Sequence, residues 1–229
     1  IDPATEGIVA RAPRATRDDL DAAITAARRA FPGWRDSAIE ERRSAVRDLA
    51  SMLRSNIDEL AELLTTEQGK PLAHARGEIE RAAMWADGIA ELEWEERIAE
   101  DTDTHVVRVR RVPLGVVGAI VPWNFPVTLA VWKIAPALLT GNTIVLKPSP
   151  MTPLTALRLG ELLREILPPG VLNVISGGDE LGPWMTSHPG FDKIAFTGSS
   201  ATGKRVMQSA AAHLTRVTLE LGGNDAAVV

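Results

Sequence analysis

Cysteine is absent from the 229-residue chain, and this absence removes several kinds of chemistry at once. Without cysteine these residues form no disulfide, hold no metal through thiolates and supply no cysteine nucleophile. Histidine is scarce as well, because His74, His105, His188 and His213 lie far apart, with no pair at the spacing of metal ligands. The sequence therefore predicts no metal site.

A basic surface and a membrane segment are also missing. With 25 basic and 30 acidic residues, the chain has no excess of positive charge to neutralise the phosphates of a nucleic acid. The longest apolar stretch, residues 112–121, contains Pro113 and two glycines and is too short to cross a bilayer. The start of the chain lacks the basic, apolar and small-residue order of a targeting signal. We therefore expect a cytoplasmic protein without a nucleic-acid or membrane partner.

The first 98 residues have the pattern of a helical region. Thr16 and Asp19 have the spacing of a capping box, and the helix they open is expected to stop at Pro32 and Gly33. Asn56 is expected to open a later helix that ends at Gly69. From apolar residues at helical spacing, helices are predicted over residues 17–31, 39–53, 57–68 and 72–99.

The pattern changes near residue 99. A turn-like segment and a partly alternating one predict a protruding hairpin over residues 99–112. Residues 113–229 then alternate short apolar runs with helical stretches, and Thr152 with Pro153 has the pattern of a helix cap and first residue. Strands are predicted over residues 116–121, 143–147, 171–175, 193–197 and 215–221. Helices are predicted over residues 127–139, 152–167 and 202–212. Residues 226–229 are strand-like. This order predicts an α/β fold with a doubly wound parallel sheet, whose ligands bind at the carboxyl ends of the strands.

A glycine-rich segment, residues 198–203, follows a predicted strand and opens a helix. Free backbone N–H groups and the helix dipole there favour a phosphate, with Gly198, Ser199 and Gly203 closest to it. Two other interpretations compete. The segment through Lys204 matches the start of a P-loop, although Arg205 stands where a Ser or Thr would hold Mg²⁺. The glycines could also serve only to make a tight turn.

Lys147 and Ser149 follow another predicted strand, at the same edge of the sheet as the glycine segment. An ammonium and a hydroxyl there could hold a ribose and a phosphate. The alternative is a lysine whose stem covers apolar surface while its charged end reaches water.

Asn124 lies in a turn with two prolines, Pro122 and Pro126, that fix the backbone on either side. A side-chain amide held in one direction can donate to a developing oxyanion, a role worth about 3 kcal/mol of transition-state stabilisation. An asparagine that only bonds its own turn fits the pattern equally well.

Glu220 ends an apolar strand directly before two glycines. Surroundings of low dielectric would raise the pKa of this carboxyl group toward neutrality, which suits a general base. A solvent-facing glutamate at a strand end is the alternative.

Taken together and in this order, these segments resemble the aldehyde dehydrogenase superfamily over the whole chain. The segments that carry the resemblance are residues 122–126 (PWNFP), 196–199 (FTGS) and 219–223 (LELGG), with support from 1–5, 67–72, 113–117 and 131–138. The resemblance implies a Rossmann-like NAD(P)-binding domain, made of residues 1–98 and 113–229, that is interrupted by an oligomerisation hairpin at 99–112. It also implies NAD or NADP as cofactor, an aldehyde as substrate, and a homodimer or homotetramer.

The resemblance also implies roles for individual residues. Asn124 would stabilise the oxyanion of the aldehyde adduct, and Glu220 would activate the water that releases a carboxylic acid. Lys147 and Ser149 would lie at the ribose, and Ser199, between Gly198 and Gly203, at the pyrophosphate. The nicotinamide side would be lined by the backbone of Ile120, Val121, Pro122, Trp123 and Leu221, and the adenine and diphosphate slot by Phe196, Gly178 and Gly182.

Three departures from the family limit this transfer. Pro150 stands where many NAD-preferring members have a glutamate for the ribose hydroxyls, which makes NADP admissible. Asn224 replaces a common lysine, for which we have no interpretation. The family's cysteine nucleophile follows the glutamate and is absent here, so we expect a fragment that is inactive alone. The alternatives are a non-catalytic dinucleotide-binding or subunit-pairing module, and an acylating relative, which would have no need of Glu220.

Overall fold

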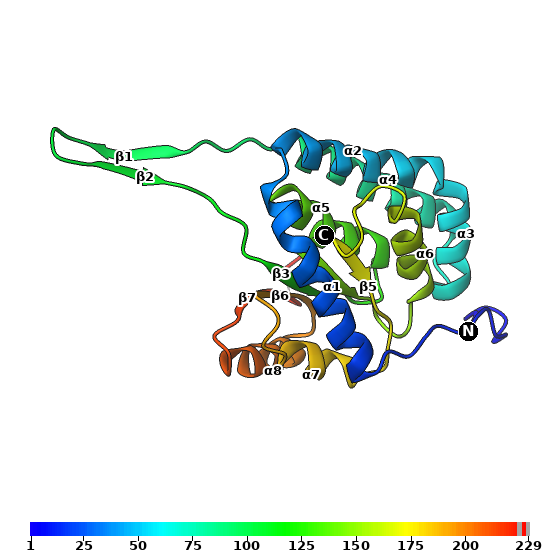
Figure 1. The fold of residues 1–229 in the computed structure, drawn as a ribbon. Coiled ribbons are helices and arrows are strands. Elements are labelled where there is room, and N and C mark those ends of the chain that lie inside the picture. Colours follow the sequence, from blue (N-terminus) through cyan, green and yellow to red (C-terminus); the bar gives the residue numbers. More distant parts are fainter. Residues whose placement is uncertain (224–225, 228–229) are drawn as a thin grey trace.

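The centre of the molecule is a five-stranded parallel sheet (Figure 1). The computed structural model describes residues 1–223 and 226–227, so that Asn224 and the end of the predicted strand at residues 226–229 lie outside the described part. The strand order is β5-β4-β3-β6-β7. The strands are β3 (Val116–Ile120), β4 (Thr143–Lys147), β5 (Leu172–Val174), β6 (Lys193–Gly198) and β7 (Arg216–Leu221). The order reverses between β3 and β6, which confirms the doubly wound α/β fold.

Helices cover both faces of this sheet. On one face lie α5 (Pro126–Leu139) and α6 (Leu154–Leu163), backed by the N-terminal helices α2, α3 and α4. On the other face lie α1, α7 (Leu181–Thr186) and α8 (Ser200–Ala211). A hydrophobic core lies on each face of the sheet, and β3 contributes to both because successive side chains of a strand point to opposite faces. Val117 and Ala119 pack into the core beneath α5 and α6, and Val116 and Ile120 pack into the core on the other face.

The N-terminal helices are α1 (Arg17–Asp36), α2 (Ile39–Ser55), α3 (Ile57–Gln68) and α4 (Leu72–Ala90). The capping box of Thr16 and Asp19 is confirmed, but the predicted stop at Pro32 is wrong, because α1 continues through Pro32 to Asp36. Trp34 explains the extra turn, since its ring is buried in the core and its Nε1 donates to the Leu138 carbonyl at 3.1 Å. Tertiary packing thus outweighs the missing backbone donor of the proline.

The predicted opening of α3 at Asn56 and its end at Gly69 are confirmed, since these residues are its N-cap and C-cap, although the side chain of Asn56 donates to the Met52 carbonyl instead of capping the helix. The predicted start of α6 at Thr152 is wrong. The hydroxyl of Thr152 is buried and has no hydrogen-bond partner among the described residues, and α6 begins at Leu154. A residue far away in the sequence, Glu67, caps α6 instead. The short helix α7 was not predicted, and α4 ends at Ala90 rather than near residue 99.

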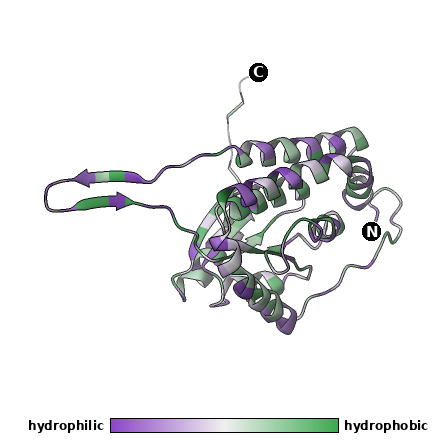
Figure 2. Ribbon diagram, turned by 45° about the horizontal axis from the view of Figure 1, so that its top comes forward, coloured by the Kyte–Doolittle hydropathy of each residue, from purple (hydrophilic) through white to green (hydrophobic). Residues whose placement is uncertain are grey.

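A two-stranded antiparallel hairpin projects far from the body of the molecule (Figure 1, left). Its strands are β1 (Arg97–Asp101) and β2 (Val106–Val109), and every residue in both is exposed. Figure 2 shows hydrophobic and hydrophilic residues mixed along the two strands. Within the described residues, no helix combines the length and the apolar character that crossing a membrane requires.

Candidate functional site

The loops that follow the parallel strands meet at one edge of the sheet. Ile120 pairs with Lys147 on one side and with Phe196 on the other, and Thr197 pairs with Glu220. The register continues past β3, since the Val121 N–H donates to the Lys147 carbonyl at 3.1 Å. The predicted residues that this edge brings together are Ile120, Val121, Pro122, Trp123, Asn124, Lys147, Ser149, Pro150, Gly178, Gly182, Phe196, Gly198, Ser199, Gly203, Glu220 and Leu221.

The turn from Trp123 to Phe125 is exposed and leads directly into α5, whose first residue is Pro126. Within the described part of the chain, the side chain of Asn124 makes no hydrogen bond, whereas its backbone carbonyl is held from outside the turn. This arrangement supports the interpretation of Asn124 as a group that meets a ligand, and it does not support the alternative of an asparagine bonded to its own turn.

The start of α5 is held by a buried carboxylate on α4. Glu78 is 0% exposed, and its Oε1 accepts from the N–H groups of Val127 at 3.0 Å and Thr128 at 3.2 Å. Lys70 pairs with the other carboxylate oxygen, so that the buried negative charge is compensated. The same ammonium donates to the Asn124 carbonyl at 2.9 Å. Residues 67–70 therefore belong to the site although the sequence interpretation gave them no role.

Lys147 is buried rather than reaching into solvent, which argues against the alternative of a charged end in water. Its side chain is 4% exposed in all, and its Nζ donates to the Pro148 carbonyl at 3.2 Å. Burial lowers the pKa of Lys147, an effect that the carboxylates of Asp179 and Glu180 oppose. A buried ammonium with one carbonyl partner keeps donors for a further polar group.

Ser149 and Pro150 lie in the loop that follows Lys147 at the end of β4. Ser149 is 9% exposed, and its Oγ accepts from the Met151 N–H at 3.2 Å. Pro150 is exposed. A proline offers no carboxylate, so position 150 itself adds no negative charge that would oppose an anion.

The glycine segment is a tight turn between β6 and α8. Ser199 is the N-cap of α8, and its hydroxyl accepts from the Thr202 N–H at 3.2 Å. A side chain at Gly198 would collide with the ring of Phe196, and one at Gly203 would come within 2.5 Å of Leu221. Because α8 already begins at Ser200, residues 200–202 are helical and the long loop of a P-loop is not formed.

Gly178 and Gly182 differ in what surrounds them. A Cβ at Gly178 would come within 2.5 Å of the Glu180 carboxylate, which itself pairs with Arg14. A Cβ at Gly182 would meet nothing within 4 Å among the described residues. A side chain at position 178 would therefore have to displace only the flexible end of Glu180, whereas position 182 faces open space.

Glu220 does not lie in the apolar surroundings that the sequence predicts, because its side chain is exposed. It lines a cavity of about 520 Å³ with Trp132, Lys133 and Lys193. Burial lowers the pKa of Lys133 to about 8, while the carboxylate of Glu220 opposes this shift and Lys193 adds to it. In the described part of the chain the exposed Glu220 therefore lies near two ammonium groups, in a cavity whose other lining residues are mostly apolar.

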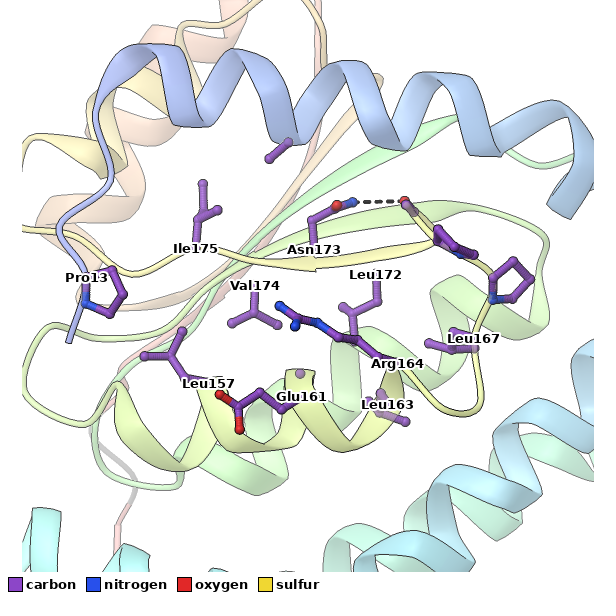
Figure 3. Close-up of a pocket in the computed structure, with 15 residues that line it drawn as sticks. Pro13, Leu157, Glu161, Leu163, Arg164, Leu167, Leu172, Asn173, Val174 and Ile175 are labelled. Carbon is purple, nitrogen blue, oxygen red and sulfur yellow. Dashed lines mark hydrogen bonds between the residues drawn. The ribbon is translucent and has the colours of Figure 1, made fainter.

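A second cavity, of about 620 Å³, lies away from this edge (Figure 3). It runs along the edge strand β5, which lies between α1 and α6, with Leu157 and Arg164 on α6 and the segment after it and Asn173 and Val174 on the strand. No predicted site residue lines it. Nor do the described residues contain a cluster of His, Asp or Glu that could hold a metal ion.

The residues at the sheet edge fit a dinucleotide in three respects. The buried ammonium of Lys147 retains donors, the open side of Gly182 leaves room for close approach, and a 12-residue helix begins at the turn after Gly198. The fold and this edge place the chain among the doubly wound α/β proteins that bind ligands at a topological switch point.

The chain belongs to the aldehyde dehydrogenase family, whose model matches residues 1–229. It is 42% identical over 230 residues to the aldehyde dehydrogenase LUC3 of a Fusarium species, covering 100% of this chain and 48% of that protein. It is 42% identical over 242 residues to the chloroplastic betaine aldehyde dehydrogenase of Amaranthus hypochondriacus, covering 100% of this chain and 48% of that protein. The crystal structure of betaine aldehyde dehydrogenase from Staphylococcus aureus in complex with NAD+ superposes with a TM-score of 0.94, at 36% identity, covering 97% of this chain and 46% of the other.

The chain thus spans about half the length of the curated relatives it matches. Family membership was predicted correctly from the sequence, because the segments that line the sheet edge are short and distinctive. The residues that were overlooked as part of the site are Glu67, Gln68, Lys70 and Glu78. These four polar side chains are a weak signal by themselves, because the backbone groups that they hold lie at least 49 residues away in the sequence.

Proposed function

We propose that this chain forms the cofactor-binding portion of an NAD(P)-dependent aldehyde dehydrogenase, and that the protein oxidises an aldehyde to a carboxylic acid. The observation that carries the proposal is the meeting of Asn124, Lys147, Ser199 and Glu220 at the carboxyl ends of four neighbouring strands. A general binding fold has no need of a free amide and a carboxylate at that edge.

In this proposal a bound dinucleotide supplies the hydride acceptor. Lys147 would hold the ribose, and the turn at Ser199 with the amino end of α8 would hold the pyrophosphate. The amide of Asn124 would donate to the aldehyde oxygen as it gains negative charge after nucleophilic attack. Glu220 would then remove a proton from the water that releases the acid.

The cofactor preference follows from the position after Ser149. A carboxylate there would repel a 2′-phosphate, and Pro150 carries none, whereas the ammonium of Lys147 is close in the sequence. We therefore propose that NADP is accepted beside NAD.

The proposal extends to assembly and location. The exposed hairpin, within residues 99–112, would pair subunits into a homodimer or homotetramer, and residues 1–98 and 113–229 would form one dinucleotide-binding domain around it. We propose a cytoplasmic location, to be checked by imaging of the tagged protein, since a relative is named as chloroplastic.

The direct test is an assay of the protein translated from the complete reading frame that contains this chain. Reduction of NAD or NADP with an aldehyde, and stoichiometric formation of the acid, is the expected result. A protein that binds the dinucleotide but oxidises no member of a panel of aliphatic, aromatic and amino aldehydes would contradict the proposed activity and would favour a non-catalytic binding module.

A further inference from the structure

The end of α3 touches both helices whose preceding loops carry the proposed site. Glu67 accepts from the N–H groups of Leu154 at 2.7 Å and Thr155 at 3.0 Å, in the first turn of α6. Gln68 and Lys70 reach the turn that precedes α5. Residues 67–70 therefore connect the loop of Lys147 with the turn of Asn124.

Gln68 holds two carbonyl groups with one amide. Its Nε2 donates to the Trp123 carbonyl at 2.5 Å and to the Asn124 carbonyl at 2.9 Å. Its Oε1 is buried and has no hydrogen-bond partner among the described residues. Exchanging the two ends of the amide would set one oxygen against two carbonyl oxygens, so the hydrogen-bond network fixes the orientation.

Lys70 makes a second set of contacts with the same turn. Its Nζ donates to the Asn124 carbonyl at 2.9 Å and lies 4.2 Å from the centre of the Phe125 ring. It also pairs with Glu78, which caps the first turn of α5. The backbone from Trp123 to the start of α5 is thus fixed from α3 and α4, whereas the side chain of Asn124 stays free.

We propose that Gln68 and Lys70 are positioning residues for the amide of Asn124: they fix the carbonyl groups of the turn so that the amide is aimed before an aldehyde arrives. The inference rests on the proposed function, in which Asn124 donates to the oxyanion. Preorganised donors stabilise a transition state because they need no reorganisation during the reaction. Neither residue touches the substrate in this account.

The test uses isosteric changes with matched controls. Gln68→Leu removes the donor, and Gln68→Glu sets a carboxylate against the two carbonyl oxygens, while Gln208→Glu makes the same change on the exposed side of α8. Lys70→Met removes the ammonium, and the double change Lys70→Met with Glu78→Gln removes both charges and keeps an acceptor for α5. Arg54→Met, which breaks ion pairs between α2 and α4, is the control for these.

Two readouts separate positioning from folding. In the protein from the complete reading frame, kcat for aldehyde oxidation should fall about 10-fold in Gln68→Leu and further in Gln68→Glu, with the dissociation constant of NAD unchanged within about twofold. In the 15N-labelled 229-residue chain, the backbone heteronuclear NOE of Asn124 and Phe125 should fall in both Gln68 variants and in the double variant, but not in the controls.

Wild-type kcat and wild-type NOE values in folded Gln68 variants would overturn the inference while leaving the proposed function intact. A parent protein that oxidises no aldehyde would instead contradict the proposed function. In that case the NOE measurement still decides whether Gln68 and Lys70 hold the turn.

Discussion

At the scale of single residues, the site is built from polar groups whose partners lie far away in the sequence. Asn124 was recognised from its prolines, but what holds its turn is Gln68 on another helix. Glu220 was placed at the correct strand end, but its expected apolar enclosure is not formed by the described residues, because enclosure depends on what packs above the strand rather than on the strand itself.

The amide of Asn124 gives the sharpest prediction at this scale. Asn124→Ala should lower kcat for aldehyde oxidation about 100- to 1000-fold, because one oxyanion donor is worth about that much. The affinity for NAD should stay unchanged, since the proposed cofactor contacts from this turn are made by the backbone of residues 120–123 and not by the side chain of Asn124. Stopped-flow and steady-state kinetics of the protein from the complete reading frame measure both quantities. A loss of NAD affinity equal to the loss of kcat would show that the turn serves the cofactor instead.

The burial of Lys133 should make the free energy of unfolding depend on pH. The pKa of Lys133 is lowered to about 8 from 10.5, so the unfolded chain binds this proton more tightly between those values. The stability of the wild-type chain therefore rises with pH through that window, whereas a methionine has no proton to lose.

Lys133→Met should accordingly stabilise the chain at pH 7 by about 1–3 kcal/mol, and this advantage should shrink between pH 8 and pH 10.5. Urea unfolding of both chains at several pH values provides the comparison. A difference that does not change with pH would mean that the ammonium is solvated in the folded state.

At the scale of helices and strands, local patterns predicted most elements but not all of their ends. The strands are short apolar runs between clear turns, so their positions agree with the prediction to within a residue or two. Helix ends were missed where tertiary contacts decide them: Trp34 prolongs α1 beyond Pro32, and Glu67 rather than Thr152 caps α6. No local signal identifies a cap that comes from 87 residues earlier in the chain.

The start of α6 provides a paired test of this conclusion. Glu67→Ala should lower the free energy of unfolding by about 1–3 kcal/mol, because the buried N–H of Thr155 and the partly buried N–H of Leu154 lose their acceptor. Thr152→Val should be neutral or slightly stabilising, since it removes a buried hydroxyl that has no partner among the described residues. Chemical denaturation gives both values, and the reverse order of the two effects would restore Thr152 as the cap.

The hairpin is the element whose exposed apolar side chains are most available for contact with a partner subunit. A two-stranded hairpin is marginally stable alone, yet Ile98, Val106, Val107 and Val109 are all 40% exposed or more. Val107→Asp should therefore shift the assembly toward monomers, as measured by sedimentation velocity. Leu214→Asp, at an apolar residue that is 91% exposed outside the hairpin, is the control. An unchanged sedimentation coefficient for Val107→Asp would remove the hairpin from the interface.

At the scale of the whole molecule, the parallel sheet turns segments from distant parts of the chain into one edge. Asn124, Lys147, Ser199 and Glu220 are separated by 23, 52 and 21 positions in sequence order, yet each follows or ends a strand of the same sheet. The sequence could predict this convergence because parallel strands place all their carboxyl ends together. It could not predict the support from residues 67–70, because hydrogen bonds from polar side chains to a distant backbone leave no periodic pattern in the sequence.

The claim that this edge is a dinucleotide site is tested most directly by calorimetric titration of the 229-residue chain with NAD and, separately, with NADP. We expect saturable binding of both, weakened at least about 10-fold by Lys147→Met and by Ser199→Ala, because each removes a polar contact to the ligand. Arg54→Met, whose ion pairs lie between α2 and α4, should bind as the unchanged chain does. A folded chain that shows no saturable binding of either dinucleotide, or one whose affinity is the same in all three variants, would contradict the account.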